Sequence, residues 1–162
     1  MTVTVRAQQV SDLPYLTGGD SPYDDFGPRA IPTATRTADL DGAGGLSVVA
    51  ADGSIAGSMS WHWVRWGPNE DSRCPMIGIW LRGDHRGHGV GTAAQSQLAQ
   101  LFFTHTAVNR VQAHTDVANV AEQRALQKAG FTREGIIRGA QWRDGAFRDG
   151  LLYARLREDV PR

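Results

Sequence analysis

Residues 85–92 read HRGHGVGT, with a glycine at every second position behind Arg86. Glycine is costly in chain entropy and is used where the backbone turns with positive φ or where another group comes very close. Successive backbone N–H groups at the start of a helix form a positive cradle for phosphate oxygens, and an arginine adds a charge-assisted hydrogen bond. The stretch therefore predicts an anion-binding loop. The alternative is an ordinary glycine-rich loop whose basic residues lie in solvent.

Spacing separates three phosphate-binding designs for this loop. A Walker-type loop needs a lysine and then Ser or Thr after its last glycine, and Gly91-Thr92 lacks the lysine. The dinucleotide fingerprint GxGxxA is matched by Gly89, Gly91 and Ala94, with Asp116 where a ribose carboxylate would be sought. That fingerprint needs its first glycine directly after a strand, whereas residues 82–88 intervene here, which makes it a poor fit.

Hydrophobic spacing predicts the elements that position the loop. Alternation indicates strands over 3–7, 46–51, 55–66 and 76–81, with Asp52-Gly53 as a two-residue hairpin signal between the second and the third. Apolar residues at helical spacing predict a helix over 90–106, followed by a strand over 110–115. The glycine loop then joins a strand to a helix. Short helices are expected over 12–16 and 33–40, in the least regular part of the chain.

The C-terminal third adds a helix and a hairpin. Asn119 is expected to cap a helix of about ten residues, with Glu122 in the capping-box position. Strands over 131–142 and 147–156 flank Asp144-Gly145, a second hairpin signal. Together the elements predict an α+β fold with a mixed sheet, in a single domain over residues 1–162.

Charge and cysteine content argue against several classes of protein. Seventeen basic and seventeen acidic residues give a formal net charge of zero, so there is no overall electrostatic case for a nucleic-acid or anionic-membrane partner. Cys74 is the single cysteine, which excludes an internal disulfide and a zinc site built from clustered thiolates. The start MTVTVRAQQ has no apolar run like that of a signal peptide, so a cytoplasmic location is expected.

The loop and the segment after it resemble the GNAT superfamily of N-acetyltransferases. The pyrophosphate loop of that family reads Arg or Gln, two residues, Gly, one residue, and Gly or Ala, which Arg86, Gly89 and Gly91 match. The stretch AHTDVANVAEQRALQKAGFTREG looks like the family's downstream strand, asparagine, helix and Gly-Phe. In the branch similar to ribosomal-protein alanine N-terminal acetyltransferases, the positions in register are Asn119, Leu126, Lys128, Gly130, Phe131, Arg138 and Asp149.

The resemblance implies an α/β three-layer, GNAT-like form of the α+β class. Its mixed, mostly antiparallel sheet of about seven strands is flanked by helices, and a splayed parallel strand pair holds coenzyme A. The activity implied is direct transfer of an acetyl group from acetyl-CoA to a primary amine of a small molecule or a peptide N-terminus, without a metal. The residues expected to bind coenzyme A are Ile79, Trp80, Leu81, Arg86, Gly87, His88, Gly89, Val90, Gly91, Thr92 and Asn119.

The family's proton-transfer residues are only partly matched. Many members have a Tyr where this chain has Leu126, and the alanine-acetyltransferase branch has a Ser where this chain has Glu122. That branch usually has a Glu in the strand where this chain has Met76. Glu122 is therefore the candidate catalytic base or proton relay, and the alternative is that it only closes the capping box.

Several alternatives for partner and donor stay open. The chain could instead be a non-catalytic acyl-CoA-binding module, or an acyltransferase that uses a longer acyl-CoA or an aminoacyl-tRNA as donor. No membrane partner is expected, nucleic acid is expected only as a tRNA-borne donor, and a homodimer stays open. The acceptor is expected between the loop 21–32 and the hairpin 142–147. Five further side chains are candidates for contact with the acceptor, and for each the alternative is a purely structural or solvated role. They are His62, His114, Asp20, Asp24 and Asp25.

Overall fold

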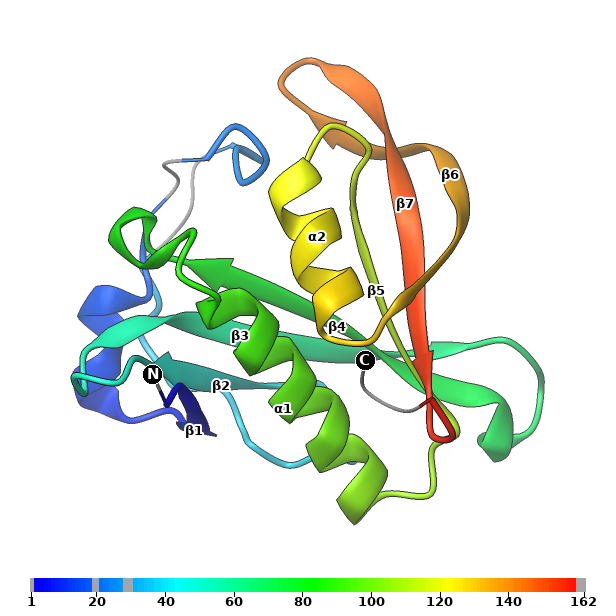
Figure 1. The fold of residues 1–162 in the computed structure, drawn as a ribbon, viewed down its shortest axis with the longest axis horizontal. Helices are drawn as coiled ribbons and strands as arrows, with labels where there is room; N and C mark the ends of the chain where they lie inside the picture. Colours follow the sequence, from blue (N-terminus) through cyan, green and yellow to red (C-terminus); the bar gives the residue numbers. More distant parts are fainter. Residues whose placement is uncertain (1, 19–20, 28–30, 160–162) are drawn as a thin grey trace.

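The computed structural model describes residues 2–18, 21–27 and 31–159, and within them seven strands form one sheet. Two α-helices, α1 (Val90–His105) and α2 (Val120–Lys128), lie together against one face of that sheet (Figure 1). The strand order is β1-β2-β3-β4-β5-β7-β6. The strands are β1 (Thr4–Ala7), β2 (Gly44–Val49), β3 (Ile55–Arg65), β4 (Arg73–Leu81), β5 (Arg110–Asp116), β6 (Thr132–Arg143) and β7 (Ala146–Leu156). The predicted α+β class with a mixed, mostly antiparallel sheet is confirmed.

The main core lies between α1 and the central strands. The helix buries Val90, Ala94, Leu98 and Phe102, which share one face at helical spacing. Trp61 and Trp63 of β3 meet the ring of Phe102 edge-on, at centroid distances of 5.6 and 5.9 Å. Because side chains alternate along a strand, Ser58 and Ser60, on either side of buried Met59, point to the other face of the sheet.

Strands β4 and β5 form the parallel pair and then separate. They are paired only where Met76 faces Gln112 and Ile77 faces Ala113. Beyond Ile77, β4 continues beside β3 as far as Leu81, while β5 continues beside β7 as far as Asp116. The splayed parallel pair that the family resemblance implied is therefore present, and it opens one backbone edge of β4.

The β6–β7 turn and the cap of α2 agree with the sequence signals. Asp144 and Gly145 both have positive φ, 52° and 67°, and form a two-residue turn between β6 and β7. The Asn119 side chain caps α2 by accepting a hydrogen bond from the Glu122 N–H at 3.2 Å. The first hairpin is longer than predicted, because Val49 pairs with Ile55 and residues 50–54 form the connection.

The segment between β1 and β2 departs from the prediction. Residues 12–16 were expected to be helical, and a 3-10 helix, η1, spans Val10–Tyr15. Residues 33–40 form no helix, because their backbone bonds to other parts of the chain. The Arg36 N–H donates to Gln8 Oε1 at 2.8 Å, and the Thr37 carbonyl accepts from the Gly45 N–H at 2.9 Å. This segment is therefore held beside the start of β2, where β1 does not pair with it.

Two further 3-10 turns complete the described structure. They are η2 (Glu70–Ser72), between β3 and β4, and η3 (Gly83–His85), which leads from β4 into the glycine loop. Over residues 2–18, 21–27 and 31–159, no helix is long and apolar enough to cross a membrane.

Candidate active site

A cavity of about 930 Å³ lies where β4 and β5 separate. Side chains from both faces of the sheet contribute to it: Ile77 and Ile79 point toward the helices, while Ser60 and Gly78 face the other way. Residues of the N-terminal segment, among them Tyr23–Gly27 and Ile31–Pro32, form the remaining side. The cavity therefore lies at the gap in the sheet and is lined from both of its faces.

The edge of β4 that borders the gap carries backbone groups available to a ligand. The Leu81 carbonyl accepts from Arg86 Nε at 2.9 Å and from Arg86 Nη2 at 2.6 Å, away from β3. The Arg82 N–H instead donates to Ala56 on the β3 side. Because backbone groups alternate between the two edges of a strand, Ile79 directs its N–H and C=O toward the gap. Among the β4 residues predicted to bind the coenzyme, Ile79 thus has both its N–H and its C=O on the edge that faces the gap.

The glycine loop has the geometry that an anion cradle requires. Gly87 and Gly89 have φ of 78° and 79°, in the left-handed region, and an added Cβ at either would meet no atom within 4 Å. The hydrogen-bond ladder of α1 starts with Ala93 N–H to Gly89 O at 3.1 Å. The N–H groups of Val90, Gly91 and Thr92 precede that ladder and mark the positive end of the helix. The residues present therefore fit a bound diphosphate.

Arg86 links this loop to two other parts of the site. Besides its contacts with the Leu81 carbonyl, its Nη2 lies 3.3 Å from Asp24 Oδ2. The guanidinium thus joins the end of β4, the start of the loop and the N-terminal segment. A direct contact from Arg86 to phosphate stays a prediction.

Glu122 lies in the first turn of α2 and lines the cavity. It does not close a capping box, because the Asn119 N–H donates to the Asp116 carbonyl at 3.0 Å. Burial raises the pKa of Glu122 to about 7; a hydrogen bond from Gln95 opposes the rise, and the negative charge of Asp24 adds to it. A carboxyl group with a pKa near neutrality suits a residue that takes up and gives back a proton.

Gln95 is a site residue that the sequence analysis missed. It is 1 % exposed, and its Nε2 donates to the Gly91 carbonyl at 3.2 Å as well as hydrogen-bonding Glu122. A sequence signal existed, because Gln95 directly follows Ala94 in the apolar stripe of α1. A long polar side chain beside a buried stripe needs a buried partner.

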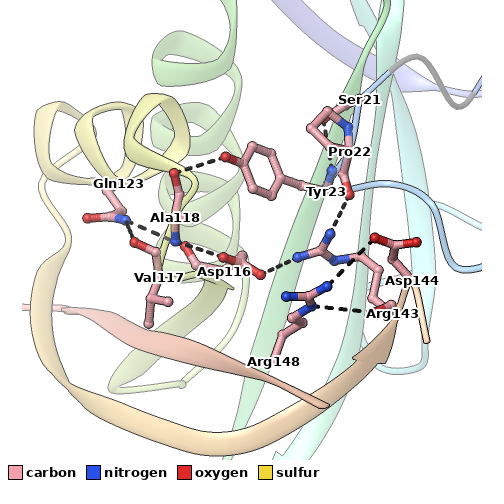
Figure 2. Close-up of polar contacts among 10 residues, drawn as sticks. All are labelled: Ser21, Pro22, Tyr23, Asp116, Val117, Ala118, Gln123, Arg143, Asp144 and Arg148. Carbon is pink, nitrogen blue, oxygen red and sulfur yellow. Dashed lines mark hydrogen bonds and ion pairs between the residues drawn. The ribbon is translucent and has the colours of Figure 1, made fainter. Parts of the chain in front are cut away.

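A second feature missed from the sequence is a buried ion pair between Asp116 and Arg143, shown in Figure 2. Arg143 also donates to the Pro22 carbonyl, and the Tyr23 hydroxyl donates to the Ala118 carbonyl at 3.0 Å. The Ala118 N–H in turn donates to Asp116 Oδ1 at 2.7 Å. These contacts fix the N-terminal segment against β5 and β6, beside the cavity. The Asp116 carboxylate, which a dinucleotide-binding fold would use to bind a ribose, is thus engaged by Arg143.

The other predicted side chains divide into two groups. His114, Asp24, Asp25 and Asn119 line the cavity together with Ile79 and Trp80. His62 is exposed on β3 and lies outside the cavity lining, and Asp20 falls outside the described residues.

The hairpin between β6 and β7 contributes less to the site than expected. Its residue in the cavity lining is Gln141, while Trp142 and Phe147 are exposed and stack edge-on at 4.9 Å. In the described ranges, no three His, Cys, Asp or Glu side chains are grouped so that they could hold a metal ion.

Comparisons with known proteins agree with this geometry. Residues 11–132 match the family model of the acetyltransferase (GNAT) domain. The chain is 28% identical over 153 residues to the putative ribosomal N-acetyltransferase YdaF of Bacillus subtilis, covering 94% of this chain and 80% of that protein. It is 29% identical over 110 residues to the probable N-acetyltransferase YjcK of the same organism, covering 68% of this chain and 59% of that protein.

Solved structures show the same architecture. Mycobacterium smegmatis RimJ in complex with CoA-disulfide superposes with a TM-score of 0.65 at 28% identity, over 74% of this chain and 56% of that one. The spermidine N-acetyltransferase of Vibrio cholerae, in complex with CoA and spermine, gives a TM-score of 0.75 over 97% and 96%, and its 16% identity shows the fold alone. The chain spans less than two thirds of YjcK and of RimJ. With its splayed strand pair, its glycine loop and the family match over residues 11–132, the chain belongs to the GNAT acetyltransferase family and is an acyltransferase.

Proposed function

We propose that this protein transfers an acetyl group from acetyl-CoA to a primary amine, and that Glu122 takes the proton of that amine. The observation that carries the proposal is a carboxyl group with a pKa of about 7 on the wall of a cavity between two splayed strands. The names of the relatives, both N-acetyltransferases, support the acetyl transfer. The proposal takes residues 1–162 as a single GNAT-like domain, in keeping with the one sheet that its described part forms.

The coenzyme is proposed to bind on the helix side of the sheet. Its diphosphate contacts the loop from Arg86 to Thr92, where Gly87, His88 and Gly89 let the oxygens approach the N–H groups of Val90, Gly91 and Thr92. Its pantetheine arm runs along Ile79, Trp80 and Leu81, whose free edge faces the gap. Asn119 lies on the opposite side of the same cavity. Two coenzyme-bound structural relatives support this assignment.

The chemistry is an exchange of one bond for another. The amine nitrogen attacks the thioester carbonyl carbon, an amide C–N bond forms, the C–S bond breaks, and coenzyme A leaves as a thiol. An ammonium acceptor loses two protons in the process; one protonates the departing thiolate and the other passes to solvent. Most primary amines are protonated at neutral pH, so a base must remove the first proton before attack. The N–H of Ile79 is placed to polarise the thioester carbonyl.

Replacement of Glu122 by Gln tests this role. Release of free thiol from acetyl-CoA is followed with a panel of primary amines, and Glu122→Gln is expected to lower turnover by about a hundredfold. Its affinity for acetyl-CoA, measured by calorimetry, should stay unchanged. The matched control is Gln127→Glu, which alters charge at an exposed position of the same helix, outside the cavity lining, and should leave turnover within a few-fold of the unmodified protein.

Three outcomes would contradict the proposal. An unaltered rate in Glu122→Gln would assign proton removal to solvent. Binding of acetyl-CoA without turnover of any amine would leave a coenzyme-binding module. Turnover with a longer acyl-CoA or an aminoacyl-tRNA, and not with acetyl-CoA, would replace the donor.

A further inference from the structure

We infer that the acceptor carries a carboxylate as well as its amine, and that Arg36 binds this carboxylate. The acceptor class that fits is a peptide amino terminus with an acidic second or third residue. The inference deepens the proposed function and rests on it. It comes from the face of the sheet opposite the helices, where a row of small residues leads from Arg36 to the gap between β4 and β5.

Gly45, Ser60 and Gly78 form that row, which we call the acceptor trough. Gly45 of β2 lies opposite Ser60 of β3, and Ser60 lies opposite Gly78 of β4. Residues directly opposite in antiparallel strands point to the same face, and Ser60 points away from the core that its neighbours Met59 and Trp61 enter. Two strand spacings of about 4.8 Å make the trough about 10 Å long. Ser60 and Gly78 line the cavity, while Gly45 is buried beneath Arg36.

Arg36 is fixed at the β2 end of the trough. Its Cδ lies 2.7 Å from the position that a Cβ on Gly45 would take, so the aliphatic stem lies directly over that glycine. Its N–H donates to Gln8, and the next residue, Thr37, accepts from Gly45. Arg36 is exposed on the rim of the cavity, and among residues 2–18, 21–27 and 31–159 its guanidinium takes part in no ion pair with a carboxylate. A fixed stem with an unmatched charge is an arrangement suited to a carboxylate ligand.

The opposite end of the cavity carries the complementary charge. Four acidic residues line it, of which Asp24 pairs with Arg86 and Asp116 with Arg143. Asp25 and Glu122 also line it, and within the described chain neither forms an ion pair. The amine end of an acceptor therefore meets negative charge near the gap, while its other end meets the positive charge of Arg36.

This charge arrangement discriminates between acceptor classes. A polyamine carries several positive charges, and one lying along the trough would bring an ammonium toward Arg36, where like charges repel. An amine with a carboxylate satisfies both ends. An extended peptide advances about 3.3–3.6 Å per residue, so an acidic side chain on the second or third residue reaches the guanidinium across the trough.

The test compares hexapeptide amides with a free amino terminus, whose second and third residues are both acidic, both neutral or both lysine. We expect kcat/KM for the acidic peptide to exceed that for the neutral peptide by about tenfold. The values for the lysine peptide and for spermidine should be lower than that for the neutral peptide. Arg36→Met keeps the stem over Gly45 and should abolish the preference, so that the acidic and the neutral peptide react with similar kcat/KM. Arg36→Glu should reverse the preference. The control Arg133→Glu makes the same charge change at an exposed position at the start of β6 and should leave the preference unchanged.

The inference fails on its own terms if spermidine or the lysine peptide reacts as well as the acidic peptide and Arg36→Met changes nothing. Acetyl transfer would then still stand. If free glutamate reacts better than the acidic peptide, the carboxylate belongs to a small molecule and the peptide assignment is overturned. If no amine is acetylated, the proposed function fails instead. Calorimetry of the acidic peptide with coenzyme A present still tests the trough, and equal affinity for the unmodified protein and Arg36→Met would refute it.

Discussion

In the proposed mechanism, proton transfer depends on two side chains, Glu122 and Gln95. Burial works against the charged form of Glu122, and the amide of Gln95 works in favour of it. Gln95 is held in turn by the Gly91 carbonyl, in the first turn of α1. The position and the acidity of the base therefore depend on the helix that begins with the glycine loop. In the proposed mechanism, Gln95 is a positioning residue that acts through Glu122.

Replacing Gln95 by Leu should raise the pKa of Glu122 further, because the opposing hydrogen bond is lost. The base works in its ionised form, so the acid limb of the turnover profile should move to higher pH, with a loss at pH 7 that recovers at pH 9. Turnover measured across this range checks the shift. Gln100→Leu is the control on an exposed part of α1, and its profile should match that of the unmodified protein. An unmoved acid limb in Gln95→Leu would show that Gln95 has no influence on the base.

At the scale of elements, the turn before α1 depends on glycine. Gly89 has a φ of 79°, which a β-branched residue adopts only with strain, and a side chain there would hold phosphate oxygens away from the amides. We expect Gly89→Val to weaken acetyl-CoA binding by at least about tenfold, as measured by calorimetry. Gly145→Val is the matched control, because Gly145 has a φ of 67° and equally open surroundings in the β6–β7 turn. Equal losses in both variants would point to general strain.

The contacts between β5, β6 and the N-terminal segment invite a second element-scale test. Arg143→Met leaves Asp116 charged and buried without its partner, which costs about 3–5 kcal/mol of unfolding free energy. Because Arg143 also holds the Pro22 carbonyl, KM for the acceptor should rise while acetyl-CoA affinity holds. Arg148→Met breaks the exposed pair with Asp144, also seen in Figure 2, and should cost less than about 1 kcal/mol. Thermal unfolding of the two variants, together with acceptor kinetics, measures the contrast.

The elements that could be predicted are those whose signals are local. The stripe Val90, Ala94, Leu98 and Phe102 predicted α1, and Asp144-Gly145 predicted its hairpin, because the chemistry of each lies within one element. The helix predicted over 33–40 was wrong, since the backbone of that segment bonds to Gln8 and to β2. Local spacing contains no information about such distant partners.

The site shows the same division. The glycine loop and Glu122 could be predicted from the sequence, because the residues of such a loop and of a helix start lie at fixed spacings along the chain. The Asp116–Arg143 pair joins residues 27 positions apart, and the Arg36 stem lies over a glycine of another strand. Neither contact leaves a periodic signal, so both become visible only when the sheet order is known.

At the scale of the whole molecule, stability at low pH depends on a group outside the cavity lining. The Asp12 carboxylate in η1 accepts hydrogen bonds from Arg6 of β1, from Ser47 of β2 and from the Gln9 N–H. Together these three contacts lower the pKa of Asp12 to about 2. Its usual pKa is 3.8, so its contribution is fully present above about pH 4 and is lost as the pH falls through 2. The N-terminal elements are thus attached to the sheet by a charge.

Asp12→Asn should lower the unfolding free energy at pH 7 by about 1–2 kcal/mol, with the difference from the unmodified protein shrinking toward pH 2. Urea unfolding at a series of pH values provides the measurement. Asp71→Asn, at an exposed position in η2, is the control and should show no such dependence. If the difference in unfolding free energy between the two proteins stays constant down to pH 2, the lost stability comes from altered packing and not from the charge of Asp12.

The position of Arg86 has a consequence for how the two substrates influence each other. Its guanidinium contacts the start of the coenzyme loop and also Asp24, whose charge acts on Glu122 and whose segment borders the acceptor. A ligand that changes the Arg86–Asp24 contact on one side of the sheet therefore changes the free energy of binding on the other. By thermodynamic linkage, the factor by which the coenzyme alters acceptor affinity equals the factor by which the acceptor alters coenzyme affinity. In the proposed arrangement, with donor and acceptor on opposite faces of the sheet, one ion pair would make their affinities interdependent.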